Sequence, residues 1–240
     1  MPKKYKKKLD YSFTQGVYPT IELLTHKPEA VQQVFIHPNS TKNSGIDKIK
    51  HLCRKNRIRL EQTVQIFNRL KSPQNTYAIA FFDKYTESLS ATEDHVLLMQ
   101  PSDMGNIGTT IRTMLGFGCN QLAIIRPAVD VFHPKAVRAS MGALFQIQVQ
   151  YFESFREYRE QFQDHHLYFY TLEDGNDSES AKMQTPATYV FGNEGEGIPH
   201  MYLEEGTAVQ IPFETQKIDS LNLSVAIGIA LHQRYIQKTS

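Results

Sequence analysis

The sequence YVFGNEGEGIP at residues 189–199 sets an apolar run directly before a loop with three glycines. Aromatic and β-branched residues that stop at a glycine predict a buried strand leading into a turn. Gly192, Gly195 and Gly197 permit positive φ and a close approach of the backbone to a ligand. Their spacing reverses that of the dinucleotide fingerprint, so the loop does not fit a Rossmann site. Taken alone, the loop is more typical of an ordinary turn after a strand.

A second segment with functional residues is Asn106-x-Gly108-x-x-x-Arg112, backed by Phe117-Gly118. It follows an apolar run at residues 95–100. Ligands of α/β proteins bind at the carboxyl ends of strands, so we expect Asn106 in the loop there and Arg112 reaching back toward that edge. The alternative is an arginine on a solvated helix side that pairs with Asp103.

A third segment runs from Ile211-Pro212 to Ser220-Leu221-Asn222-Leu223-Ser224, where a long helix is expected to begin. Ser220 is a natural N-cap, which alone would explain its presence. The free N–H groups of a helix start also bind anionic groups. Ser220 and Asn222 are therefore candidates for both capping and binding, and capping is the simpler role for Ser220.

Predicted strands and helices alternate through the second half of the chain. Apolar runs predict strands at 95–100, 121–126, 167–172, 189–192 and 209–212, and helical periodicity predicts helices at 107–115, 134–141 and 220–236. Alternation of this kind favours an α/β fold with a mainly parallel sheet covered on both faces.

The first half predicts a smaller α/β domain over residues 1–92. A basic tail, residues 1–9, precedes helices at 18–24 and 46–56 and strands at 31–38, 58–60 and 77–82. About 90 residues can fold alone. Residues 83–94 are polar and aperiodic, which is typical of a linker.

The net charge of +1 conceals a division between the two halves. Residues 1–92 hold 16 Lys and Arg against 7 Asp and Glu, a balance of +9, and the remaining 10 and 18 leave residues 93–240 at −8. Such asymmetry indicates that the N-terminal part meets a polyanion. A solvated basic face is the alternative, and the charge balance alone does not distinguish the two.

Cysteine content and hydropathy limit the cellular compartments that we expect for the protein. Cys53 and Cys119 are too few and too isolated for a disulfide framework or a zinc site. No apolar run approaches the roughly 20 residues needed to cross a bilayer. We expect a cytoplasmic protein without a membrane partner.

In their order and spacing, the three segments resemble the motifs of the SpoU (TrmH-like) branch of the SPOUT RNA methyltransferases. The resemblance implies methyl transfer from S-adenosylmethionine to a ribose 2′-hydroxyl of ribosomal or transfer RNA, with no metal required. It implies that residues 93–240 form a SPOUT catalytic domain with a deep trefoil knot, dimerising through the knotted region. General topology rules predict an unknotted sheet, so the knot rests on the resemblance alone.

The same resemblance assigns roles to individual residues. The backbone at Gly192, Ile211 and Leu221 is expected to hold the cofactor. The residues matching the family's active site are Asn106, Arg112, Glu194, Ser220 and Asn222. Glu194 is expected to position its loop or the amino group of the cofactor.

Two roles remain open for Arg112. The resemblance makes it the group that activates the ribose hydroxyl. A guanidinium with a pKa above about 12 is normally a permanent cation and not a base. The alternative role is electrostatic, with Arg112 fixing the RNA phosphate and stabilising the developing alkoxide.

The segment from His133 to Phe145 is also typical of the branch. Lys135 and Arg138 are candidates to grip RNA near the site. Equally, this helix would pack through Ala136 and Val137 with its charges in water.

Residues 1–92 resemble, more loosely, the substrate-binding domain of many SpoU enzymes, whose fold is like that of ribosomal protein L30e. The positions expected to meet RNA phosphates are Lys48, Arg54, Arg57 and Arg59. The competing hypothesis is a catalytically silent RNA-binding or ribosome-assembly protein on the same fold. The intact set of active-site residues argues against it.

Overall fold

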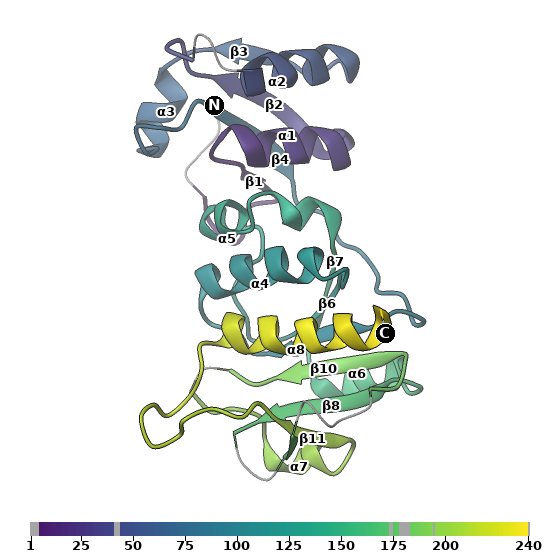
Figure 1. Cartoon of the computed structure of the whole chain (residues 1–240). Coiled ribbons are helices and arrows are strands. Elements are labelled where there is room, and N and C mark those ends of the chain that lie inside the picture. Colours follow the sequence, from purple (N-terminus) through teal and green to yellow (C-terminus); the bar gives the residue numbers. More distant parts are fainter. Residues whose placement is uncertain (1–4, 41–43, 173–174, 178–182, 194, 240) are drawn as a thin grey trace. The chain divides into compact units, whose positions relative to one another are not determined.

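The chain divides into two compact units, each with its own sheet. The computed structural model describes residues 5–40, 44–172, 175–177, 183–193 and 195–239 (Figure 1). The first unit contains Met1–Tyr85 and Asp130–Gln146. The second contains Thr86–Val129 and Ile147–Ser240.

The sheet of the first unit is mixed. Its strands lie in the order β1 (Tyr11–Phe13), β4 (Ala78–Asp83), β2 (Val31–Ile36) and β3 (Leu60–Gln62). β4 is antiparallel to both of its neighbours, whereas β3 is parallel to β2 and forms an edge. The predicted strands and helices of this half are confirmed at their approximate positions.

Helices α1 (Val17–His26) and α2 (Ser44–Lys55) pack on each other. The shorter α3 (Gln65–Leu70), which the sequence pattern does not reveal, adds Ile66 and Phe67 to an aromatic cluster with Phe13, Phe35 and Phe81. Burial of such side chains contributes about 1.5–3 kcal/mol each. The first unit therefore has a hydrophobic core of its own.

Residues 130–146, which the sequence pattern assigns to the second domain, pack instead with the first unit. They form α5 (Pro134–Ala139) and the 3₁₀ helix η2 (Ala143–Gln146). Lys84 Nζ contacts Asp130 Oδ2 at 2.7 Å, and both side chains are largely buried. The rings of Phe82 and Phe145 lie 5.3 Å apart. Apolar burial and this ion pair hold residues 130–146 in the first unit. A single boundary near residue 92 therefore does not separate the two units completely.

The sheet of the second unit is parallel throughout. Its order is β7-β6-β5-β10-β8-β11-β9, and the strands are β5 (His95–Met99), β6 (Gln121–Ile125), β7 (Gln148–Phe152), β8 (His166–Thr171), β9 (Asn176–Asp177), β10 (Ala187–Phe191) and β11 (Thr207–Gln210). The predicted strands are confirmed. β7 escapes prediction because this edge strand, mostly only partly buried, alternates with glutamines.

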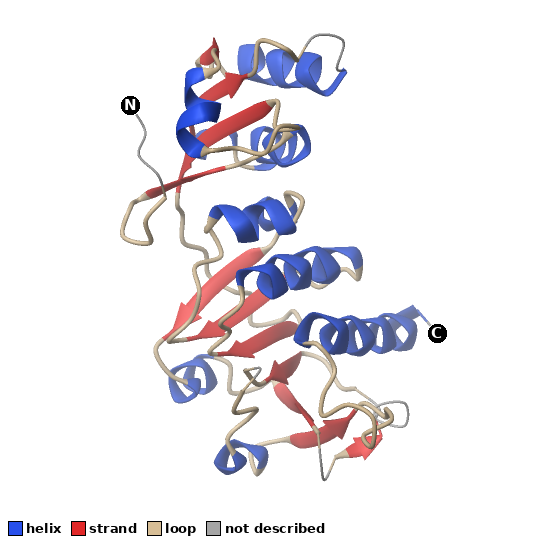
Figure 2. Ribbon diagram, turned by 90° about the vertical axis from the view of Figure 1, so that its left-hand side faces the viewer, coloured by secondary structure: helices blue, strands red, loops and turns tan. Residues whose placement is uncertain are grey.

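Helices cover both faces of this sheet. α4 (Met104–Gly116) and α8 (Leu223–Thr239) pack side by side on one face, and α6 (Phe155–Gln161) lies on the other (Figures 1 and 2). The short α7 (His200–Leu203) follows the glycine loop. Parallel strands covered in this way bring their carboxyl ends to a common edge.

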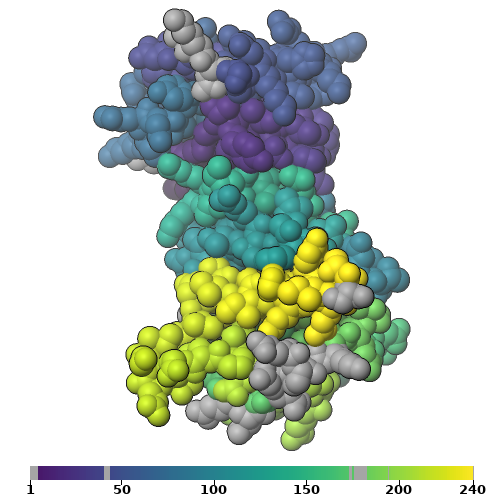
Figure 3. All heavy atoms as spheres, in the orientation of Figure 1, coloured from purple at the N-terminus to yellow at the C-terminus, as the bar shows by residue number. Residues whose placement is uncertain are grey.

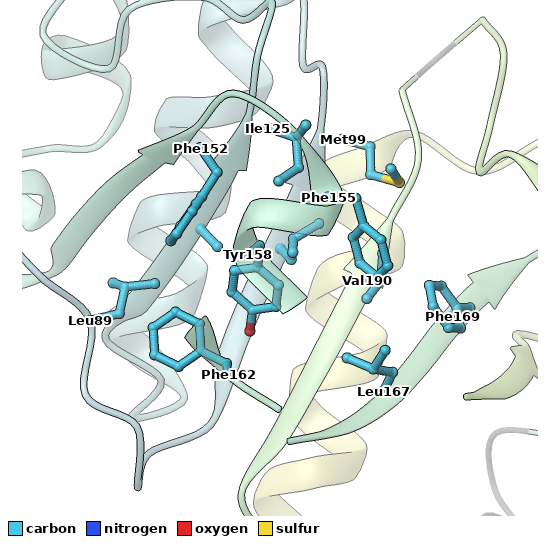
Figure 4. Packing of buried hydrophobic residues seen from close by; sticks show 12 residues of the cluster. Leu89, Met99, Ile125, Phe152, Phe155, Tyr158, Phe162, Leu167, Phe169 and Val190 are labelled. Atoms are coloured by element: carbon cyan, nitrogen blue, oxygen red, sulfur yellow. The ribbon is translucent and has the colours of Figure 1, made fainter. Parts of the chain in front are cut away.

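An aromatic cluster on the α6 side holds these strands in place. Phe152, Phe155 and Tyr158 are at most 1% exposed and pack with Leu97 and Phe169 (Figure 4). The Phe152 and Tyr158 rings meet edge to face, with centroids 5.2 Å apart. Close packing of this kind leaves little freedom for the strand ends.

A buried ion pair anchors α8 at the amino ends of the parallel strands, opposite their carboxyl ends. Arg234 Nε lies 2.7 Å and Lys238 Nζ 2.6 Å from Asp94 Oδ2, and the Asp94 side chain is 1% exposed. Burial alone would raise the pKa of Asp94, but hydrogen bonds from Lys238, the Ala187 amide and Arg234 outweigh it and lower the pKa. These contacts fix the position of α8 on the sheet through the C-terminal half of the helix.

Beside it lies a buried histidine network. His95 Nδ1 is 2.8 Å from the Tyr158 hydroxyl, which is 2.6 Å from Thr188 Oγ1. His165 Nδ1 reaches the same Thr188 hydroxyl at 2.9 Å. Burial lowers the pKa of His95 to about 4, and repulsion from His165 adds to the shift. Burial also lowers the pKa of His165, so both side chains favour the neutral form and act as hydrogen-bond partners inside the fold.

Candidate functional site

A cavity of about 410 Å³ opens at the carboxyl edge of the second sheet. Its walls come from the ends of β8 and β10, the glycine loop, the segment after β11 and the start of α8. The lining includes Tyr170, Phe191, Gly192, Asn193, Gly197, Ile211, Ser220, Leu221, Asn222 and Leu223. Two of the three sequence segments thus meet in one concave site.

Close backbone packing explains the first glycine of the loop. A Cβ on Gly192 would lie 2.2 Å from the carbonyl carbon of Gly197, so no side chain fits there. Gly197 itself has φ of 68°, which favours glycine. Asn193 Oδ1 accepts hydrogen bonds from the amides of Gly195 and Glu196, at 2.8 and 2.6 Å. The loop is held by its own contacts, and Glu194 lies outside the described residues.

The expected cap of the C-terminal helix is corrected by the structure. α8 begins at Leu223, and Asn222 caps it: Asn222 Oδ1 accepts from the Ser224 amide at 3.0 Å and from the Ser224 hydroxyl at 2.7 Å. Capping by Ser220 was wrong, because the helix starts two residues later than a Ser220 cap requires. Ser220 is exposed on the cavity wall instead.

Asn106 joins the remaining segment to this site. It lies in the first turn of α4, where its amide nitrogen donates to Asp103 Oδ1 at 2.8 Å. The side-chain nitrogen of Asn222 donates to Asn106 Oδ1 at 3.1 Å. The Asp103 carboxylate caps α4 and so holds Asn106 beside the cavity mouth.

Arg112 lies elsewhere on α4. It is exposed and is not among the described residues that line the cavity. Six residues of helix advance the chain by roughly 9 Å, and α4 runs away from the carboxyl edge. Within one chain, the structure brings Asn106 and Asn222 together but does not bring Arg112 to them.

The six candidate RNA-binding residues are all exposed and all belong to the first unit. Lys48 and Arg54 lie on α2, Arg57 and Arg59 follow it, and Lys135 and Arg138 lie on α5. Arg59 Nη2 lies 3.7 Å from Glu61 Oε2. Surface pairs of this kind contribute little to stability, so the charges remain usable by a ligand.

Metal ligation finds no support in the part of the chain that the structure describes. No group of three His, Cys, Asp or Glu side chains there is arranged to hold an ion. Cys53 and Cys119 are free and buried, and burial raises the pKa of each thiol to about 11. Among the described helices, none has the length and apolar character of a membrane span.

Residues 93–232 match the model of the SpoU rRNA Methylase family, which is more than half of the chain. The chain belongs to this family. An uncharacterized tRNA/rRNA methyltransferase of Archaeoglobus fulgidus is 30% identical to this chain over 210 residues, or 85% of this chain and 92% of the relative. The 23S rRNA (adenosine(1067)-2′-O)-methyltransferase of Streptomyces azureus is 32% identical over 157 residues, or 63% and 57%.

Solved structures show the same fold. The SpoU methyltransferase AviRb of Streptomyces viridochromogenes, in complex with AdoMet, matches this chain with a TM-score of 0.81 at 22% identity, covering 96% of this chain and 91% of AviRb. An AdoMet-bound rRNA methyltransferase from Sinorhizobium meliloti matches with a TM-score of 0.79 at 21% identity, covering 93% and 86%. The expected α/β fold with a parallel sheet is confirmed.

Proposed function

We propose that this protein transfers a methyl group from S-adenosylmethionine to a ribose 2′-hydroxyl of ribosomal or transfer RNA. One observation carries the proposal: the hydrogen bond from Asn222 to Asn106 joins the three family segments around one cavity. The 2′-O specificity named for the Streptomyces azureus relative supports it. We propose a cytoplasmic location for this activity.

The cavity fits S-adenosylmethionine in size and lining. Its volume of about 410 Å³ falls in the range of about 300–1,000 Å³ usual for small-ligand sites. Phe191, Ile211 and Leu221 offer apolar surface for an adenine ring, and the close loop at Gly192 forms a backbone wall. When bound, the cofactor supplies a methyl group on a sulfonium, which is an electrophile. Backbone at Gly192, Ile211 and Leu221 would hold it, and AviRb holds AdoMet in the same fold.

The polar side chains at the cavity mouth would position the ribose. Asn106 and Asn222 are mutually oriented and can bind the 2′-hydroxyl, with Ser220 beside them on the wall. They would hold the hydroxyl oxygen facing the methyl group that the cofactor would supply, and the hydroxyl proton would leave to water. Holding the two reactants in line is the main contribution of these residues. We assign Glu194 the task of positioning the glycine loop.

For Arg112 we propose an electrostatic role. An arginine stays charged throughout the working pH range, so it stabilises a developing alkoxide and holds an RNA phosphate better than it accepts a proton. Its exposed position on α4, along the helix from Asn106, suits contact with the RNA backbone beside the target nucleotide.

The first unit would supply most of the RNA affinity, as an L30e-like substrate-binding domain. Its exposed Lys48, Arg54, Arg57 and Arg59 lie within a segment of charge +9. Neutralising phosphates releases counterions, so affinity should depend steeply on salt. Lys135 and Arg138 add to the basic surface of the same unit.

A trefoil knot and a homodimer complete the proposal. In the sheet, β10 lies between β5 and β8, so the C-terminal segments cross over earlier strands. α8 is exposed along one face of the second unit (Figure 3). Val225 and Ile236, eleven residues apart on one side of α8, are 50% and 48% exposed. A second copy would cover these apolar side chains.

Methyl transfer from labelled S-adenosylmethionine to RNA from cells lacking the gene tests the function. We expect one or a few nucleotides to gain a 2′-O-methyl group, mapped by resistance to alkaline cleavage. RNA binding and cofactor binding without transfer would instead favour a catalytically silent RNA-binding or assembly protein. Calorimetry showing no cofactor binding, with or without RNA, would remove the proposed site.

A further inference from the structure

The first unit holds a second concave site, apart from the three family segments. This cavity of about 360 Å³ lies between β2, β3 and α3, and its lining includes Gln33, Phe35, Arg59, Glu61, Ile66 and Arg69. The volume suits a single small ligand or one nucleotide. All lining residues belong to the first unit, so the site does not depend on the second unit.

Strand register builds the floor of this cavity. Phe35 on β2 pairs in parallel register with Glu61 on β3, and alternation puts Gln33 on the same face as Phe35. Phe35 and Ile66 are 5% and 6% exposed. The Phe81 ring supports Phe35 edge to face at 5.9 Å. The floor is therefore apolar, aromatic and rigid.

The walls combine a carboxylate, an amide and two guanidinium groups. Gln33 Nε2 donates to Glu61 Oε2 at 3.1 Å, and Arg59 Nη2 lies 3.7 Å from the same oxygen. These contacts orient Glu61, whose side chain is still 45% exposed and open to further donors. Arg59 and Arg69 are exposed on the rim.

This arrangement of charge restricts what the cavity can bind. A phosphate inside would face the Glu61 carboxylate, whereas on the rim it would meet Arg59 and Arg69. A flat base lies well on an aromatic floor and against a guanidinium plane. A carboxylate accepts hydrogen bonds from an amino group on a base edge. Uracil has no amino group: its N3–H can donate to one carboxylate oxygen, but the carbonyl oxygens on either side repel the Glu61 carboxylate.

We propose that this cavity binds one unpaired RNA nucleotide whose base carries an amino group, in addition to the target nucleotide in the second unit. The proposal rests on the proposed RNA substrate. It makes the first unit a reader of one base and not only a basic surface. Arg59 and Arg69 hold the flanking phosphates, and Glu61 selects the base.

Binding of the full chain to four labelled pentaribonucleotides, UUGUU, UUCUU, UUAUU and UUUUU, tests this by fluorescence anisotropy. We expect at least one amino-bearing base to bind about tenfold more tightly than UUUUU. Glu61→Gln should reduce that ratio to about one, since the amide replaces an acceptor by a donor. Arg69→Ala should weaken all four oligomers.

Asp47→Asn is the matched control. It also converts an exposed carboxylate to an amide, but on α2 and outside the cavity lining. This variant should keep the base preference. Equal binding of all four oligomers by the wild type, no saturable binding of any, or an unchanged preference in Glu61→Gln would each overturn the inference.

The methyl transfer assay separates this inference from the proposed function. If the wild type methylates RNA but shows no base preference, the nucleotide cavity is wrong and the enzyme assignment stands. If the wild type methylates no RNA, the proposed function fails whatever the oligomers do.

Discussion

The side-chain amide of Asn222 donates a hydrogen bond of 3.1 Å to Oδ1 of Asn106, across 116 positions of sequence. Each of the two residues is fixed independently. Asn222 caps α8 through Ser224, and Asn106 lies in a turn capped by Asp103. The hydrogen bond therefore joins the first turn of α4 to the start of α8 beside the cavity, where the ribose would bind.

Replacing Asn222 separates capping from catalysis. Asn222→Ser keeps a good N-cap but is too short to reach Asn106, so methyl transfer should fall roughly 10–100-fold with little change in thermal stability. Asn222→Ala should lose both the transfer and about 0.5–2 kcal/mol of stability. Single-turnover rates and thermal melts measure the two effects. Normal rates in both variants would remove Asn222 from the active site.

Adding one carbon at Gly192 should displace the glycine loop that forms one wall of the proposed cofactor site. In Gly192→Ala the new Cβ meets backbone of Gly197 at 2.2 Å, which the loop can relieve only by moving. We expect calorimetric affinity for S-adenosylmethionine to fall at least tenfold. Gly116→Ala is the control, because no heavy atom lies within 4 Å of its new Cβ. Equal affinities in the two variants would contradict the role of the loop.

Arg112→Ala should abolish transfer and spare the rest of the protein. The side chain is exposed, so the fold and cofactor affinity should stay nearly intact while the rate falls about 10²–10³-fold. Arg156→Ala removes a comparable exposed arginine on α6 and should remain active. Arg112→Lys distinguishes the two roles: a purely electrostatic group keeps partial activity and the same pH profile.

Acidification should destabilise the second unit through His95. Burial holds its folded-state pKa near 4, below the ordinary value of about 6.5. The folded state thus binds this proton more weakly, so stability is full above about pH 6.5 and is lost as pH falls toward 4. Linkage gives a loss of roughly 2 kcal/mol between pH 7 and 5. Urea unfolding at both pH values should show a smaller loss in His95→Gln than in the wild type.

RNA affinity should reside in the basic surface of the first unit. Reversing Lys48, Arg54 and Arg57 to Glu should weaken RNA binding strongly, reduce its salt dependence and leave cofactor binding unchanged. Truncation near Thr92 is a poorer experiment, since it would remove the partners of residues 130–146 and leave that segment uncovered. Filter binding at several salt concentrations measures the effect. Unchanged RNA affinity in the triple variant would show that this basic surface faces solvent and does not bind RNA.

The sequence alone determined most strands of the second unit, its helices α4 and α8, and several residues of the cavity. β5, β6 and β10 are short apolar runs that end at polar or glycine residues, and such patterns are local. The family resemblance of their segments predicted that Gly192, Ile211 and Leu221 share one site, and all three line the cavity. The α/β fold follows from alternation, because parallel strands require crossover helices.

Only the tertiary structure decided which of several equally suitable residues takes each role. Ser220 and Asn222 are both good caps, and the true start of α8 at Leu223 selects Asn222. Residues 130–146 leave the second unit because Asp130 and Phe145 have buried partners in the first unit. The sequence pattern revealed neither the anchor between Asp94 and Arg234 nor the nucleotide cavity at Glu61. Such contacts join distant segments, and local periodicity carries no record of them.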